Sequence, residues 1–260
     1  MSESPLSGIT VLVTRAVEQA AVLEAPLAAL GARVILTPSI RFEEPDDWTP
    51  ADAALRRAAS YDWAIFTSAN GVEAVSRRLE AIALSWEAFR GVRLVAIGPA
   101  TAGALAEHAL PVEAVPERYR AEGILSSLSS EPISGHRILL ARAAKARDVL
   151  PEELKRKGAR LDDVVVYRTK GCAPSAQAME TLARFASAKV VVTFTSSSTV
   201  TSFLDRLPPE AIDGLRKCTL AAIGPVTSEE LVRRGFPPRI IPGHSTVPAL
   251  VEAIRSHFAS

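Results

Sequence analysis

Hydroxyl-rich turns placed directly before predicted helices are the residues best suited to chemistry in this chain. Two of them have the sequences TSANG at residues 67–71 and TSSST at residues 195–199. A serine or threonine at a helix start accepts a backbone N–H, and the free N–H groups beside it attract carboxylates or phosphates. Helix capping alone is the alternative interpretation. The candidate anion ligands in these turns are Ser68, Ser196, Ser197 and Ser198.

A second pair of turns follows the pattern Ile-Gly-Pro-x-Thr, at residues 97–101 and 223–227. The glycine permits close approach of a ligand to the backbone, and the proline begins the next helix. Thr101 and Thr227 then offer hydroxyls beside unpaired amides. Four such turns together indicate a ligand with several acidic groups.

Two arginines stand where a strand is expected to end. Arg15 follows the apolar run 11–13, and Arg142 follows the run 138–140. A guanidinium can bind a carboxylate through two parallel hydrogen bonds. Both arginines are therefore candidate substrate ligands, and a structural ion pair is the alternative for each.

Tyr167 differs in type from its surroundings because it follows three consecutive valines. One interpretation is a core tyrosine whose hydroxyl has an internal partner. The other is a phenol that faces a substrate and acts as a weak acid.

Other chemistry has little support in the sequence. The four histidines have no partner at the spacing of a metal site or a catalytic pair, and there is no phosphate loop or Gly-x-Gly-x-x-Gly. The two cysteines do not form a Cys-x-x-Cys pair. We therefore expect no metal and no cofactor.

The candidate turns occur in pairs because the chain repeats itself. Gly31-Ala32-Arg33 returns as Gly158-Ala159-Arg160, and the other paired segments return at nearly the same offset of about 127 residues. Each copy is the size of a domain rather than of a solenoid unit. The repeat predicts two similar lobes with a ligand-binding cleft between them.

Short apolar runs alternate with stretches rich in Ala, Leu, Glu and Arg, which predicts an α/β fold with parallel strands buried on both faces. The expected strands are 9–14, 33–37, 63–67, 93–97, 137–141, 164–167, 190–195, 219–223 and 239–241. The expected helices are 19–30, 72–81, 100–109, 147–157, 199–207, 226–234 and 247–257. Glycines at 31, 158 and 235 fit helix C-terminal caps.

Two extended segments interrupt this alternation, near residues 37–45 and 165–171. Aligned at the repeat offset, Tyr167 in the second segment corresponds to Ile40 in the first. Both segments are suited to cross between lobes. If they do, each lobe contains the opening of one copy and the remainder of the other.

The composition is that of an ordinary globular chain of 260 residues, with 48% hydrophobic residues and a net charge of +1. A near-neutral charge disfavours a nucleic-acid partner. We expect no signal peptide, because residues 1–7 lack a basic segment followed by an apolar one, and the sequence has no apolar run of membrane-spanning length. We expect a cytoplasmic protein, monomeric and without a membrane partner.

Several of these segments together resemble the uroporphyrinogen-III synthase family. They are Val-Leu-Val-Thr-Arg at 11–15, Phe-Thr-Ser at 66–68, Val-Val-Val-Tyr-Arg-Thr at 164–169, Phe-Thr-Ser at 194–196 and Ala-Ala-Ile-Gly-Pro-Val-Thr at 221–227. The resemblance covers residues 8 to 258, and the order and spacing of the motifs make it specific.

The resemblance implies two similar doubly wound, flavodoxin-like lobes joined by a two-stranded crossing linker. The first domain would hold residues 1–37 and 172–260, and the second residues 38–171. It also implies the reaction and its substrate, hydroxymethylbilane. This linear tetrapyrrole loses its hydroxyl as water, ring D attacks through its substituted carbon, and a spiro-pyrrolenine leads to uroporphyrinogen III with ring D inverted. The family uses no cofactor.

The resemblance assigns the catalytic phenol to Tyr167, which would assist departure of the hydroxyl. It assigns substrate binding to Thr227 and to one of the serines at 196–198, with Ser68 and Thr101 as their counterparts in the other lobe. A different class also fits the repeat and its anion-binding turns. That alternative is a two-lobed binding or regulatory protein that closes on an acidic small molecule without transforming it.

Overall fold

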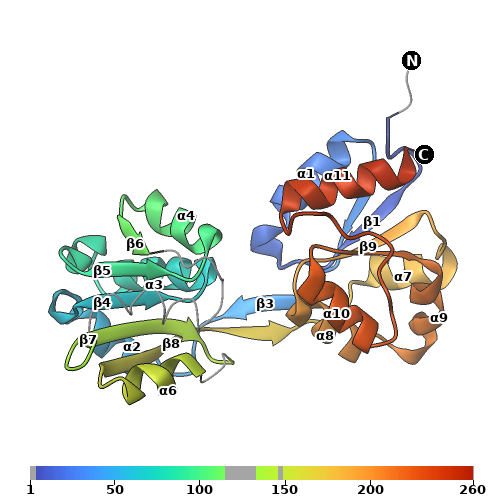
Figure 1. Cartoon of the computed structure of the whole chain (residues 1–260). Coiled ribbons are helices and arrows are strands. Elements are labelled where there is room, and N and C mark those ends of the chain that lie inside the picture. The colour runs from blue at the N-terminus through green and yellow to red at the C-terminus, as the bar shows by residue number, and fades with distance from the viewer. Residues whose placement is uncertain (1–3, 115–132, 146–148, 260) are drawn as a thin grey trace. The chain divides into compact units, whose positions relative to one another are not determined.

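The strands form two sheets, and the chain divides by its internal contacts into two units. The structure is a computed structural model that describes residues 4–114, 133–145 and 149–259 (Figure 1). Unit 1 comprises Met1–Arg41 and Lys170–Ser260, and unit 2 comprises Phe42–Thr169.

Unit 1 contains a parallel sheet in the order β10-β9-β1-β2. Its strands are β1 (Thr10–Val13), β2 (Arg33–Leu36), β9 (Val190–Phe194) and β10 (Thr219–Ala222). A single parallel bridge between Ala221 and Ile240 extends it beyond β10. The strands are continuous apolar runs because helices cover both faces.

The helices of unit 1 are divided between the two faces of its sheet. On one face, α1 (Ala21–Ala29), which follows the short η1 (Val17–Gln19), lies beside α11 (Val247–Phe258), as Figure 1 shows. The other face carries α7 (Ala176–Arg184), α8 (Ser197–Asp205), α9 (Pro209–Lys217) and α10 (Pro225–Arg233).

The second sheet has the order β3-β8-β7-β4-β5-β6, and it forms the core of unit 2. Its strands are β3 (Ile40–Glu43), β4 (Trp63–Phe66), β5 (Arg93–Ala96), β6 (Val112–Ala114), β7 (Arg137–Ala143) and β8 (Arg160–Gly171). The pairs from β8 to β6 are parallel.

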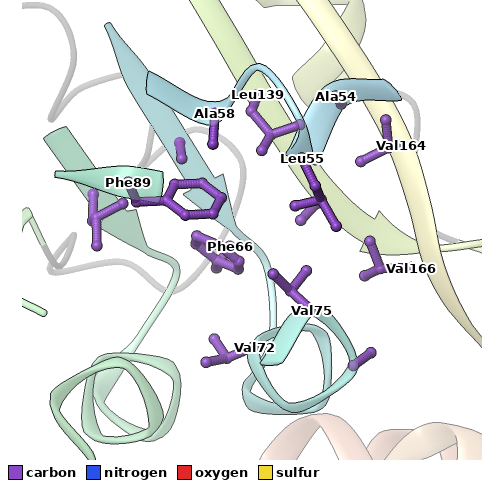
Figure 2. Packing of buried hydrophobic residues seen from close by; sticks show 14 of the residues in the cluster. Ala54, Leu55, Ala58, Phe66, Val72, Val75, Phe89, Leu139, Val164 and Val166 are labelled. Carbon is purple, nitrogen blue, oxygen red and sulfur yellow. The ribbon is translucent and has the colours of Figure 1, made fainter. Parts of the chain in front are cut away.

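One face of this sheet packs against α2 (Thr49–Leu55), α3 (Ala69–Ala81) and α4 (Pro99–Glu107), together with η2 (Ala58–Ser60) and η3 (Trp86–Phe89). Figure 2 shows Leu55, Phe66, Val75 and Phe89 meeting in this layer. The opposite face packs against α6 (Val149–Arg156) through Leu150 and Leu154.

The two copies of the repeat exchange their opening segments. In unit 1, β1 of the first copy pairs with β9 of the second copy, and β2 lies beyond β1. In unit 2, β7 of the second copy pairs with β4 of the first, and β8 lies beyond β7. Each unit thus has the flavodoxin-like order 2-1-3-4-5 when its strands are numbered by copy. Each sheet therefore contains strands of both copies.

The chain passes from one unit to the other through β3 and β8, which are neighbours in the sheet order. The start of β3 is fixed to unit 1 by the buried Ser39. Its hydroxyl lies 3.1 Å from the carbonyl oxygens of Thr14 and Thr199. Its own carbonyl accepts the Ser202 hydroxyl at 2.6 Å and the Cys172 N–H at 2.7 Å.

The predicted elements are present except the strand at 239–241, of which only the single bridge at Ile240 is found, and there are two further kinds of difference. The helices after the Thr-Ser turns begin two or three residues earlier than expected, because the capping serine starts the first turn. The helices α2, α7 and α9 and the strands β3 and β6 were not predicted. The three C-cap glycines are confirmed, with φ of +90°, +84° and +78° at Gly31, Gly158 and Gly235.

Candidate active site

An irregularity in β8 determines where Tyr167 points. Arg142 of β7 is opposite Val165, but the next residue, Ala143, is opposite Tyr167, so Val166 is an extra residue in the ladder. Such a bulge re-aims the side chain that follows it. Tyr167 therefore shares a face with Val164 and joins the α3 side of the core. Figure 2 shows Val164 and Val166 pointing into this same layer.

The Tyr167 hydroxyl meets the start of α3. Its oxygen lies 3.0 Å from Oγ of Ser68, and either hydroxyl can donate. Ser68 is the N-cap of α3, and its Oγ accepts the Gly71 N–H at 3.0 Å. The absence of a side chain at Gly71 leaves this space open, since a Cβ there would lie 3.3 Å from Ser68 Oγ.

The ring of Tyr167 packs against Phe42 of β3. The ring centroids are 5.7 Å apart, and the planes cross at 82°. Tyr167 itself is 9% exposed. Its phenol is thus held by an aromatic ring on one side and a helix-capping hydroxyl on the other.

Arg142 lies on β7, the strand next to β8, and forms an ion pair with Asp163 of β8. Its Nε donates to Oδ1 at 2.6 Å and its Nη2 to Oδ2 at 2.8 Å. Both side chains are largely buried. In this structure Arg142 therefore has the contacts of a structural ion pair, which was the second interpretation given for it from the sequence.

The Gly-Pro turn of unit 2 begins α4 as expected. Gly98 is its N-cap, Pro99 is its first residue, and no side chain caps it. Thr101 is 3% exposed, whereas Ala100 is exposed. Helix geometry leaves the Ala100 amide without an intrahelical acceptor.

The serine-rich turn of unit 1 is a capping box at the start of α8. Ser196 Oγ accepts the Thr199 N–H, and Thr199 Oγ1 accepts the Ser196 N–H, both at 3.2 Å. Ser198 is exposed, and its Oγ lies 2.9 Å from that of Ser196. Ser197 Oγ donates to the Val226 carbonyl at 3.3 Å.

That last bond links the serine turn to the neighbouring Gly-Pro turn of α10. Thr227 is 4% exposed, but Val226 is 56% exposed. Gly224 leaves room for Ser245, because a Cβ at position 224 would overlap with Ser245 Oγ. Within unit 1, then, Ser197 and Ser245 both adjoin the start of α10.

Arg15 follows β1 and Thr14 at the carboxyl edge of the unit 1 sheet. Its Nε donates to Gln19 Oε1 at 3.0 Å. Burial lowers the pKa of the Arg15 guanidinium below its ordinary value, and a guanidinium remains charged at neutral pH. Arg15 thus carries positive charge at the same edge as the α8 and α10 turns.

The structure brings Tyr167 and Ser68 into contact within unit 2, and Ser196, Ser197 and Ser198 together within unit 1. The sequence analysis missed Phe42, Gly71 and Ser245. The signal for Gly71 was an unusual glycine in the first turn of a helix. Nothing in the sequence connected Phe42 to Tyr167, because the contact depends on strand pairing and on the bulge.

Two further observations concern the described residues only. No group of three or more His, Cys, Asp or Glu side chains in residues 4–114, 133–145 and 149–259 could hold a metal ion. None of the helices in these ranges has the length and hydropathy needed to cross a bilayer.

Comparisons with known proteins identify the family of this chain. The family model for uroporphyrinogen-III synthase HemD matches residues 21–252. The chain is 33% identical to uroporphyrinogen-III synthase of Synechococcus elongatus over 90% of each chain. It is 32% identical to a putative uroporphyrinogen-III synthase of Methanothermobacter thermautotrophicus, over 93% of this chain and 96% of that one.

Solved structures show the same fold. A uroporphyrinogen III synthase mutant of Thermus thermophilus matches 95% of this chain and 98% of its own, with a TM-score of 0.65 and 20% identity. The uroporphyrinogen-III synthetase of Helicobacter pylori matches 96% and 99%, with a TM-score of 0.62 and 20% identity. The chain therefore belongs to the uroporphyrinogen-III synthase family, the cyclising lyases of tetrapyrrole biosynthesis that act on hydroxymethylbilane.

Proposed function

We propose that this chain closes hydroxymethylbilane to uroporphyrinogen III and that the Tyr167 hydroxyl protonates the departing hydroxyl group. The observation that carries the assignment is the 3.0 Å contact between Tyr167 and Ser68 at the start of α3. It supports the role because it connects a phenol to a hydroxyl that is already oriented by a backbone amide.

The hydrogen bonds suggest a direction for the proton. Ser68 Oγ accepts the Gly71 N–H, so its own proton is free to be donated to the phenol oxygen. The phenol proton then points outward to the substrate. Transfer to the hydroxyl of the bilane breaks the C–O bond and releases water, which leaves an azafulvenium cation.

The later steps need positioning rather than further acid. Ring D attacks the cation through its substituted carbon, and the spiro-pyrrolenine opens and closes again with ring D inverted. The final ring closure releases a proton from a pyrrole carbon, which restores the phenol. Because the bilane also closes without inversion in solution, the enzyme acts mainly by holding the reacting rings in one geometry.

The substrate carboxylates require cationic and N–H-rich surfaces. In unit 1 we assign carboxylate binding to Arg15, to the serines at 196–198 and to the backbone amide of Val226, an exposed residue at the start of α10. In unit 2 we assign carboxylate binding to the Ala100 amide, and a substrate-binding role for Ser68 stays a prediction because its only proton is donated to the phenol oxygen. The buried Thr101 and Thr227 would act within the turns that present these amides, and a binding role for Arg142 stays a prediction because Asp163 already pairs with it.

The test is to supply freshly made hydroxymethylbilane and to quantify the type III and type I isomers. We expect the wild-type chain to make the type III isomer and Tyr167→Phe to lower its kcat by about 100-fold, the lower range of general acid catalysis. A Tyr167→Phe enzyme that makes type III at the wild-type rate would remove Tyr167 from the mechanism.

Tyr61 is a matched control for the loss of a tyrosine hydroxyl. It lies just before β4, at the opposite end of the strand from Ser68, and its hydroxyl donates to Asp162 Oδ2 at 2.5 Å. Tyr61→Phe removes a hydrogen bond of unit 2 without touching the Tyr167 site. It should lower the free energy of unfolding and leave kcat unchanged.

Three properties of the whole chain complete the proposal. We place the enzyme in the cytoplasm as a monomer, and light scattering on the purified protein checks the oligomeric state.

We also propose that the chain has two domains. The first contains residues 1–37 and 172–260, the second contains residues 38–171, and the linkers lie near 37–45 and 165–171. Cleavage sites in limited proteolysis check those boundaries.

A further inference from the structure

Phe42 is the aromatic side chain that packs against the Tyr167 ring. It is the first residue of unit 2, on β3, and it is half-buried against the core layer that contains α2 and α3. Its ring meets that of Tyr167 edge to face, with centroids 5.7 Å apart. A contact of this geometry holds one ring in a fixed direction relative to the other.

Tyr167 lies where the paired part of its own strand with β7 ends. The register between β7 and β8 ends with the pair Ala143 and Tyr167. Beyond this point β8 continues to Gly171 with β3 as its sheet neighbour. The bulge at Val166 selects the face on which Tyr167 lies, and on that face the Phe42 ring packs edge to face against the phenol.

The neighbouring Arg168 holds the chain that carries Phe42. Its Nε donates to the Glu44 carbonyl oxygen at 3.0 Å, and its Nη1 forms an ion pair with Asp46. A third contact places its Nη2 3.9 Å from Glu43 Oε2. The residue after Tyr167 thereby ties β8 to the end of β3, which keeps Phe42 against the phenol.

We propose that Phe42 is a positioning residue that holds the Tyr167 phenol in line with Ser68 and so raises the yield of the ring-inverted product. The inference rests on the proposed role of Tyr167. A phenyl ring has no group that can transfer a proton, so Phe42 acts through Tyr167. When it is lost, the phenol samples rotations in which its hydroxyl does not reach the leaving group.

Phe42→Leu tests this proposal because it keeps an apolar side chain and removes the ring. We expect kcat for the type III isomer to fall about 2- to 10-fold with KM unchanged, the range of an aromatic edge-to-face contact. The type I fraction should rise. Phe42→Tyr, which restores the ring, should return kcat to within about twofold of wild type. An unchanged kcat and isomer ratio in Phe42→Leu would overturn the proposal.

Phe89 provides the stability control. It is fully buried in the same core layer and contacts Phe66 and Trp86 rather than Tyr167. Phe89→Leu should reduce stability at least as much as Phe42→Leu, while the isomer ratio measured well below the unfolding temperature stays at the wild-type value. A matching shift in the Phe89 variant would mean that the ratio follows stability, which contradicts the positioning role.

A double mutant separates positioning from packing. In a Tyr167→Phe background there is no phenol hydroxyl to align, so adding Phe42→Leu should change kcat less than twofold. An undiminished effect there would show that Phe42 acts independently of Tyr167.

If the wild-type chain makes only the type I isomer, the proposed function itself fails. If type III is made but Tyr167→Phe is fully active, the roles of Tyr167 and Phe42 fail and the overall reaction stands.

Discussion

The Ser68 hydroxyl contacts two groups, the Gly71 N–H and the Tyr167 hydroxyl, each at 3.0 Å. The first contact caps α3 and is structural, whereas the second is assigned to catalysis. The two do not compete, because a serine oxygen accepts one hydrogen bond while its proton is donated to another group. Removal of this hydroxyl should therefore have two effects that separate experimentally.

Ser68→Ala should lower the free energy of unfolding by about 1 kcal/mol, the usual cost of losing a serine cap. It should also lower kcat for the type III isomer, because the phenol loses the partner that orients its proton. Urea unfolding and the isomer assay measure the two effects.

Ser175→Ala is the matched control. Ser175 caps α7 by accepting the Ala178 N–H at 3.3 Å, and it belongs to unit 1, whereas Tyr167 belongs to unit 2. Its loss should cost similar stability and leave kcat unchanged. If Ser68→Ala behaves in the same way, the Ser68 hydroxyl is a cap only.

Helices and strands could be predicted from the sequence where the residues that define them are neighbours in the chain. Runs such as Val190–Phe194 indicate the buried strands directly, and Ser68, Pro99 and Pro225 indicate helix starts. By contrast, α9 begins at Pro209 within a Pro-Pro pair that is typical of a loop, although proline suits the first turn of a helix.

The parts of the site that depend on pairing were not predictable in this way. The bulge at Val166 lies in a run of three valines, any of which fits a regular strand. A one-residue shift reverses the face of each later side chain. The sequence alone therefore identified Tyr167 as unusual, but its contacts with Ser68 and Phe42 follow from the register of β8 against β7.

Helix packing in unit 1 yields a test at a single glycine. Gly214 of α9 faces α7 so closely that a Cβ would overlap with the Leu182 carbonyl oxygen. Gly214→Ala must push the two helices apart, and we expect a loss of about 2 kcal/mol or more in the free energy of unfolding. Chemical denaturation measures it.

Gly103 in α4 is the converse case, because nothing lies within 4 Å of a Cβ at that position. Gly103→Ala should raise the free energy of unfolding by about 0.5–1 kcal/mol, the difference in helix propensity. Equal effects of the two alanines would show that α7 and α9 are not in close contact.

The free energy of unfolding of the whole molecule should decrease at alkaline pH because one buried thiol ionises more readily in the unfolded chain. Cys218 joins α9 to β10, and burial raises the pKa of its thiol to about 11. An unfolded thiol ionises near pH ~8.5, so the unfolded chain loses this proton first as the pH rises. The protonated Cys218 thiol therefore makes its full contribution to the free energy of unfolding below about pH 8.5, and this contribution is lost progressively toward pH 11.

We expect this group to remove about 2 kcal/mol from the free energy of unfolding between about pH 8 and pH 10.5. Cys218→Ala should show a correspondingly smaller decrease over the same range, as measured by urea unfolding at each pH. Parallel pH profiles for the two proteins would contradict the role of the thiol.

The exchange of opening segments between the two copies also sets an order of events during synthesis. All residues of unit 2, from 42 to 169, emerge from the ribosome before β9 and β10 of unit 1 emerge. Since β1 pairs with β9, the first 41 residues wait for more than half of the chain before their sheet can close. The residues of the unit that carries Tyr167 are therefore complete first, and the unit that contains the N-terminus is the last whose strands are all available for folding.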